Sequence, residues 1–172
     1  MPQYPKCSWK KITIGSKALT RHQSIQWLAM HKKLTTVDRL RKGGISVATD
    51  CVLYEKSIEE TMEHLYFECD YFGHLWATLL KWLGETHTIG SWNAETEWLE
   101  KRSSSRVRAQ LVRFLYAAVV YHVWVERNQR RFQDKKITSQ QRIKFIILEL
   151  HTRGQKEMKW QKELDKLNYY PS

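Results

Sequence analysis

The residues of this chain whose types and spacing could do chemistry are Cys51, His64 and Cys69. Structural zinc sites hold the metal in a tetrahedron of thiolate and imidazole ligands, and two of these ligands are usually cysteines separated by two residues. Tyr54 stands where the second cysteine of such a pair is expected. A phenol has a reference pKa of about 10, so at neutral pH it offers zinc a protonated oxygen instead of an anion. The pattern therefore predicts a zinc site with three ligands and one open position.

Water or another side chain could fill the open position, and His74 is the nearest candidate because it follows Cys69 by five residues. Alternatively the metal is absent, the cysteines are small buried hydrophobic side chains, and Tyr54 packs against apolar neighbours. Hydrolytic zinc enzymes also keep an open position, but the chain has neither an HExxH helix nor the His-x-Glu and Cys-x-x-Cys pattern of zinc deaminases. We therefore expect no enzymatic activity.

The spacing between His64 and Cys69 restricts the backbone between them. We expect a helix over residues 58–68 that carries His64. A regular α-helix turns by about 100° per residue, so side chains five residues apart do not share one face. Convergence of both side chains on one metal ion requires the helix to break or kink between residues 67 and 70.

Apolar periodicity predicts a mainly α-helical fold, a small helical domain with an irregular zinc-knuckle-like segment and a long C-terminal helix pair. We expect helices over residues 22–33, 35–43, 58–68, 72–83 and 103–133, a short helix before residue 100, and a helix from residue 138 or 139 to 150. Two core faces are predicted by spacing, formed by Ile25, Leu28 and Ala29, and by Phe72, Leu75, Trp76, Leu79, Leu80 and Leu83.

Capping signals and composition divide the chain. Three helix starts are predicted by Thr35 with Asp38, by Ser57 with Glu60, and by Thr138 or Ser139. We expect three regions: a loose leader over residues 1–20, a helical domain over 21–135, and a C-terminal amphipathic helix with a charged tail over 136–172.

The charge balance favours a polyanionic partner. The chain carries 29 Lys and Arg against 18 Asp and Glu, a net charge of +11. Two basic groups, with aromatic residues between them, predict contact with RNA or single-stranded DNA: Lys32, Lys33, Arg39, Arg41 and Lys42, then Arg127, Arg130 and Arg131. Alternatively the charge is a solvated exterior, and the three arginines complement the end of a helix dipole.

Cysteine usage and hydropathy indicate the compartment. Three cysteines form no paired framework, and the N-terminal residues contain no apolar run of the kind found in signal peptides. The longest strongly apolar run, residues 114–125, is too short to span a bilayer. We expect an intracellular protein, in the nucleus or cytoplasm, with no membrane segment.

Several segments in a fixed order resemble one known family. The segments are IQWLAMHKKLTTVDRLRKGGI, CVLY, EHLYFEC and VWVERNQRRF. Together, over roughly residues 22–133, they are similar to the zinc-binding region of plant LINE-type (non-LTR) retrotransposon reverse transcriptases. The hallmark of that region is Cys-x-x-Cys, a spacer, then His-x-x-x-x-Cys. Cys51, His64 and Cys69 match this hallmark, and Tyr54 departs from it.

The resemblance implies a non-catalytic module, derived from a retrotransposon, that binds RNA or single-stranded DNA and uses zinc. The chain has no adjacent pair of aspartates of the kind that hold catalytic magnesium in polymerases. The alternative is a helical protein-interaction or structural module, or the remnant of a decayed element, whose C-terminal helix contacts a partner through Trp160, Leu164 and Leu167. The sequence predicts no oligomeric state.

Overall fold

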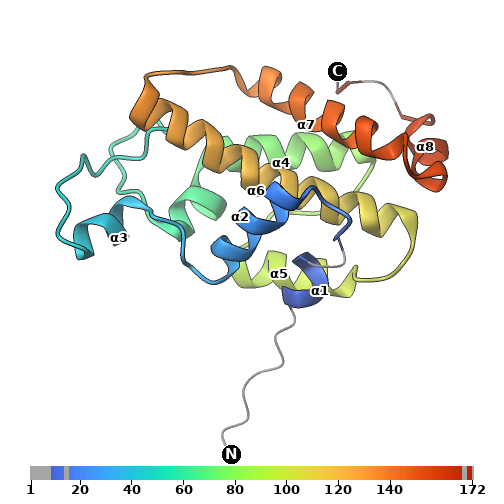
Figure 1. Cartoon of the computed structure of the whole chain (residues 1–172), viewed down its shortest axis with the longest axis horizontal. Helices are drawn as coiled ribbons and strands as arrows, with labels where there is room; N and C mark the ends of the chain where they lie inside the picture. The colour runs from blue at the N-terminus through green and yellow to red at the C-terminus, as the bar shows by residue number, and fades with distance from the viewer. Residues whose placement is uncertain (1–8, 14–15, 168–169, 172) are drawn as a thin grey trace, which may run out of the picture.

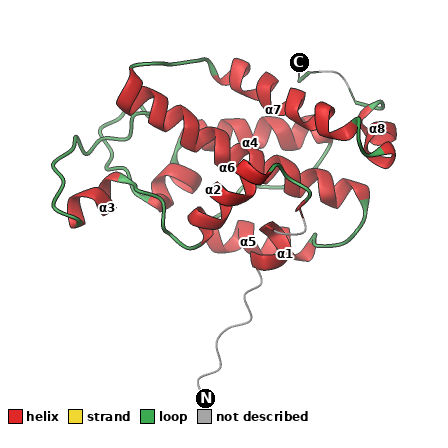
Figure 2. Cartoon of the chain, in the orientation of Figure 1, coloured by secondary structure: helices red, strands yellow, loops and turns green. Residues whose placement is uncertain are grey.

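The structure is a computed structural model that describes residues 9–13, 16–167 and 170–171. Within these residues it contains helices and no strand, as Figures 1 and 2 show, which confirms the mainly α fold class. The elements are α1 (Trp9–Thr13), α2 (Thr20–Met30), α3 (Val37–Lys42), the π-helical turn η2 (His64–Glu68), α4 (Asp70–Leu83), α5 (Trp92–Lys101), α6 (Val107–Gln133), α7 (Ser139–Gly154) and α8 (Met158–Leu164).

The 27-residue helix α6 is the centre of the molecule. Helices α2, α4 and α7 pack against it, and Figure 1 shows it running the length of the bundle. Every residue from 111 to 120 is buried, so its apolar surface extends around the helix instead of forming one stripe. A helix that is apolar on all sides is stable only when other elements surround it. Its neighbours therefore form a single hydrophobic core with it.

Helix α4 confirms the predicted core face. All six apolar residues expected on one side of it are buried. The helix ends at Leu83, and Gly84 follows with φ of 74°, a left-handed conformation that glycine adopts without steric cost. The short helix expected before residue 100 is α5.

The C-terminal part folds back on the bundle. The N-cap Thr138 and Gln141 form a capping box, in which the Thr138 hydroxyl accepts from the Gln141 amide at 3.1 Å and the Gln141 side chain accepts from the Thr138 amide at 2.9 Å. After Gly154 the chain turns, and α8 packs against α7 and α6. Trp160 and Leu164 are buried there, so the predicted C-terminal stripe contacts the body of the same chain.

Two predicted helix starts are wrong, and one predicted core face is borne out in part. On α2, Ala29 is buried and Ile25 and Leu28 are partly buried against the core, while His22 and Gln26 are also fully buried. The N-cap of α3 is Thr36, one residue after the expected Thr35, and the helix runs from Val37 to Lys42.

Only the second part of the helix expected over 58–68 forms: residues 62–68 are helical, and the last five of them make the π turn η2. Residues 51–61 form an irregular loop, and Asp50 pairs with Glu59 in an isolated antiparallel bridge. Glu60 does not form the expected capping box with Ser57, because its carboxylate pairs with Arg127 and Arg131 of α6.

The N-terminal region also differs from a loose leader. Residues 9–13 form α1, and Ile12 is buried in the core. Residues 1–8 lie outside the described part. Helices α7 and α8 share the core with α4 and α6, while the division at residues 135 and 136 stays a prediction. Among the helices described, none combines the length and apolarity needed to cross a bilayer.

Candidate metal centre

Cys51, His64 and Cys69 lie together in the structure. One ligand atom from each residue lies within 4.8 Å of the other two, and all three residues are buried. Cys51 comes from the irregular loop, His64 begins η2, and Cys69 lies between η2 and α4. Two sulfurs and an imidazole nitrogen are the donors that zinc prefers. This buried group could hold a metal ion.

The π-helical turn brings His64 and Cys69 to one side. The amide of Cys69 donates to the carbonyl of His64 at 2.8 Å, five residues back instead of the four of an α-helix. Cys69 itself is extended, with φ of −78° and ψ of 125°, and α4 starts afresh at Asp70. The predicted break between residues 67 and 70 is confirmed, and the π turn supplies the extra residue that the metal spacing requires.

The orientation of His64 leaves one ring nitrogen for a metal. Its Nδ1 lies 3.9 Å from a carboxylate oxygen of Glu68, which is beyond hydrogen-bond distance. Its Nε2 is buried, and no hydrogen-bond partner for it exists among the described residues. Buried polar atoms are almost always paired, so an orphaned nitrogen beside two sulfurs fits a metal ligand.

The two thiols are not equivalent. The thiol of Cys51 donates to the sulfur of Cys69, and this bond together with burial raises the pKa of Cys51 well above its usual range. Accepting that bond lowers the pKa of Cys69 against the effect of burial, helped by the backbone N–H groups of Tyr71 and Phe72. Cys69 is the N-cap of α4, where the helix dipole favours an anion. Cys69 is therefore the sulfur that loses its proton first.

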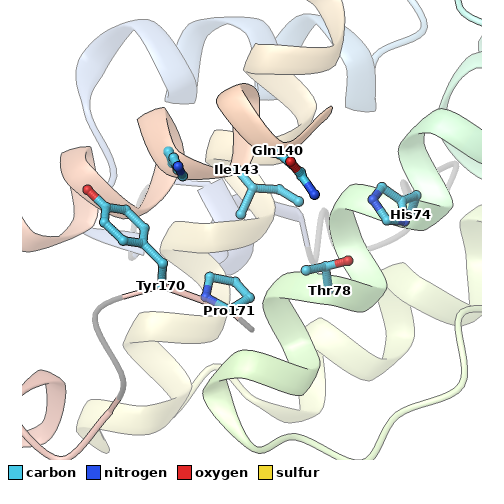
Figure 3. A pocket seen from close by; sticks show the side chains of 7 residues that line it. His74, Thr78, Gln140, Ile143, Tyr170 and Pro171 are labelled. Atoms are coloured by element: carbon cyan, nitrogen blue, oxygen red, sulfur yellow. The ribbon is translucent and has the colours of Figure 1, made fainter. Parts of the chain in front are cut away.

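Tyr54 and His74 lie in different places. The Tyr54 ring packs edge-on against the His64 ring with 5.6 Å between centroids, so Tyr54 covers one side of the group. His74 is exposed on α4 and lies outside the group. It lines a pocket of about 380 Å³ with Thr78, and Figure 3 shows the two residues facing Gln140 of α7 across it.

Glu60 joins the loop that carries Cys51 to the central helix. It is fully buried, and its carboxylate accepts from Arg127 at 2.6 Å and from Arg131 at 3.1 Å. The same carboxylate accepts from the amide of Val37 at 3.1 Å, so it also caps α3. Sequence reasoning missed this role because the partners are 67 residues apart.

The other arginines of α6 hold the backbone of the loop. Arg131 donates to the carbonyls of Ala48 at 3.0 Å and Asp50 at 2.7 Å. Arg130 donates to the carbonyl of Val52 at 3.3 Å and pairs with Glu126 at 2.7 Å. These carbonyls flank Cys51 on both sides. Arg130 and Arg131, which were predicted to bind nucleic acid, thus hydrogen-bond to the backbone of the loop that carries Cys51. Arg127, the third member of the predicted group, is 0% exposed.

The first basic group lies on the surface instead. Each member is exposed, and the group comprises Lys32, Lys33, Arg39, Arg41 and Lys42. Three members pair with carboxylates, Lys32 with Glu63, Arg41 with Glu59 and Lys42 with Asp38. The two predicted basic groups therefore differ in kind: one is open to a polyanion and the other is largely enclosed by protein.

The comparison with protein families agrees with this geometry. Residues 1–76 match the family model for zinc-binding in reverse transcriptase. The match contains Cys51, His64 and Cys69 and ends within α4, so this zinc-binding region covers less than half of the chain. The model describes an accessory zinc-binding region and not the catalytic part of a reverse transcriptase. No curated protein and no solved structure matches the chain.

Proposed function

We propose that the chain is a non-catalytic module, derived from a LINE-type reverse transcriptase, that binds RNA or single-stranded DNA. The observation that carries the proposal is the exposed basic group at α2 and α3, which lies on the same part of the chain as the zinc-binding match. Zinc held by Cys51, His64 and Cys69 would cross-link the loop to the start of α4. A cross-linked loop would give the basic surface a fixed shape.

Trp27 supports a single-stranded partner. Its side chain is 37% exposed at the end of α2, and the ring of His31 lies 4.2 Å from its ring. The ammonium of Lys33 lies 5.1 Å from the same ring. An exposed indole beside a cation can stack a nucleobase while the cation contacts the adjoining phosphate. Stacking needs an unpaired base, so this arrangement favours single strands over duplexes.

A hollow next to Trp27 adds room for a base. It measures about 430 Å³ and is lined by Thr13, Gln23, Ser24, Trp27 and Leu28. Arg39 is exposed on α3 and donates to the carbonyl of Lys32. We assign stacking to Trp27 and phosphate contact to Lys33 and Arg39. The buried Arg127 is assigned to the loop.

The test compares two charge reversals of equal size. Lys33→Glu with Arg39→Glu should weaken binding to a labelled single-stranded RNA by more than about tenfold at physiological salt, measured by fluorescence anisotropy. Lys159→Glu with Lys162→Glu is the matched control, because both lysines are exposed on α8, which Figure 1 places at the other end of the molecule from α3. The control should lose much less affinity.

Two results would contradict the proposal. One is the absence of binding to any nucleic acid at low salt. The other is an equal loss in both charge-reversed variants, which would mean that net charge alone attracts the polyanion. Trp27→Ala should cost a further 1–3 kcal/mol or so if a base stacks there.

A protein partner is the second candidate function. Phe145 and Leu148 are 49% and 48% exposed on the outer side of α7, one turn apart. Trp160 and Leu164, the residues expected to meet a partner, are buried against the chain itself. Binding through the α7 pair should change little with salt, whereas phosphate contact should weaken steeply as salt rises.

A further inference from the structure

A second group of metal-binding side chains lies at the junction of three helices. His22 comes from α2, His122 from α6 and Glu149 from α7. The Nε2 atoms of both histidines lie 2.9 Å from the same carboxylate oxygen, Oε2 of Glu149. One ligand atom from each residue lies within 4.8 Å of the other two. His22 is 0% exposed and His122 is 5% exposed.

His22 is not satisfied by its protein neighbours. Neither of its ring nitrogens makes a hydrogen bond within the described part of the chain, although Nε2 is close to Glu149. The contact is short but lacks hydrogen-bond geometry, so the nitrogen and the oxygen do not aim at each other. The rings of Phe114 and Tyr121 pack against His22 and offer it no strong acceptor. A fully buried imidazole whose Nδ1 has no partner and whose Nε2 meets a carboxylate only off its hydrogen-bonding axis is costly unless a further ligand is present.

The spacing suits a metal ion at the centre. Zinc binds imidazole nitrogen and carboxylate oxygen at about 2.0–2.2 Å in a tetrahedron, which separates neighbouring ligand atoms by roughly 3.3 Å. Both observed nitrogen–oxygen separations are 2.9 Å. Opening by a few tenths of an ångström, through side-chain rotation, would admit the ion.

Two arginines border the group. Arg21 donates to the other oxygen of Glu149, Oε1, at 2.5 Å, so that Oε2 is the oxygen that faces the two histidines. Arg142 lies 3.4 Å from Nδ1 of His122. Because a guanidinium only donates, the His122 proton is on Nε2 when no metal is bound. Metal binding at Nε2 would move that proton to Nδ1, and Arg142 would then rely on its bonds to Glu126 and Gln129.

We propose that His22, His122 and Glu149 form a second metal site for a divalent ion of the zinc class, with water as the fourth ligand. Two histidines and one carboxylate with an open position are a known zinc arrangement. His122 and Glu149 lie beyond residues 1–76, so this site is separate from the zinc-binding region matched by the family model. A bound ion would tie α2 to α6 and α7 and so join the matched region to the rest of the chain.

The test removes the first site so that only the second can respond. In the full chain carrying Cys51→Ser and Cys69→Ser, cobalt(II) should still bind at about one equivalent, without the sulfur-to-cobalt charge-transfer band of a thiolate site. Adding Glu149→Gln should weaken cobalt binding by at least about tenfold. The matched control is His87→Gln. His87 also pairs with a buried carboxylate, Glu95, at 2.7 Å, but no second histidine belongs to that pair.

Two outcomes would overturn the proposal: the cysteine variant binds no cobalt, or Glu149→Gln leaves binding unchanged. If Glu149→Gln fails to fold, as judged by circular dichroism, a second measurement decides. Zinc added to the cysteine variant should shift the ring-nitrogen NMR signals of both His22 and His122. Unshifted signals would exclude the site. Loss of RNA binding by the full chain leaves this proposal untouched, because neither rests on the other.

Discussion

At the scale of residues, the position of Tyr54 has the most direct consequence for the metal. The Tyr54 amide lies 3.4 Å from the Cys51 carbonyl, so the two residues bracket a tight turn, as the cysteines of a zinc knuckle do. The Tyr54 ring lies 5.6 Å from the His64 ring and offers the group no thiolate. Three donors remain for the ion.

Tyr54→Cys should restore a fourth ligand. We expect zinc affinity to rise by more than about tenfold, because each added thiolate contributes to a site whose complete form binds with roughly 10–16 kcal/mol. Competition with a chromophoric chelator measures the change. Tyr54→Phe keeps the ring without the hydroxyl and should leave affinity as it is. Equal zinc affinity in Tyr54→Cys and the parent would mean that another group already completes the site.

At the scale of elements, the start and end of α4 are set by different devices. Its start is Cys69, whose extended backbone separates α4 from the π turn. Its end is Gly84, with φ of 74°, and the guanidinium of Arg108 caps the Leu83 carbonyl. A Cβ added at Gly84 would lie 2.9 Å from Nη2 of Arg108. Gly73 is inside the same helix, and nothing within 4 Å would meet a Cβ there.

Alanine substitutions at Gly73, inside α4, and at Gly84, its C-cap, should change the free energy of unfolding in opposite directions. Gly73→Ala should stabilise the fold by about 0.5–1 kcal/mol, because alanine loses less backbone freedom in a helix. Gly84→Ala should destabilise it by about 1–2 kcal/mol, because a left-handed residue with a Cβ is strained. Urea unfolding of both variants measures the difference. A stabilising Gly84→Ala would contradict the C-cap described here.

At the scale of the whole molecule, buried carboxylates hold segments far apart in sequence. Burial opposes ionisation of Glu126, but hydrogen bonds from Arg130 and Arg142 outweigh it and lower its pKa. Burial also opposes ionisation of Glu85, and hydrogen bonds from Arg102 and Arg108 outweigh it and lower the pKa of Glu85.

These lowered pKa values predict acid-sensitive stability. A carboxyl group whose pKa is lower in the folded than in the unfolded chain stabilises the fold above the unfolded value, about 4.5. That stabilisation is lost as the pH falls through the folded pKa. The free energy of unfolding should therefore drop between about pH 5 and about pH 2, measured by urea titration. Glu126→Gln should flatten part of this drop. Glu97→Gln is the control, since its side chain is 66% exposed beside Lys101.

Much of the helical framework follows from the sequence. The apolar spacing of α4, the capping box at Thr138 and the glycine at residue 84 act within a turn or two of backbone, so local patterns predict them. The pairing of Cys51 with the His64 and Cys69 half-site was also predicted, since the donor types and their order suit one metal ion. Even the break before Asp70 follows from helical geometry.

The tertiary structure alone decided which polar groups meet. Glu60 was expected to cap its own helix and instead pairs with Arg127, because a buried guanidinium must find a carboxylate wherever the fold brings one. His22, His122 and Glu149 also come together from three helices that are distant in sequence. Such long-range pairs leave no periodic trace in the sequence. The stretch from Cys51 to Cys69 therefore supplies the candidate metal donors, and packing against α6 determines the conformation of the loop that presents Cys51.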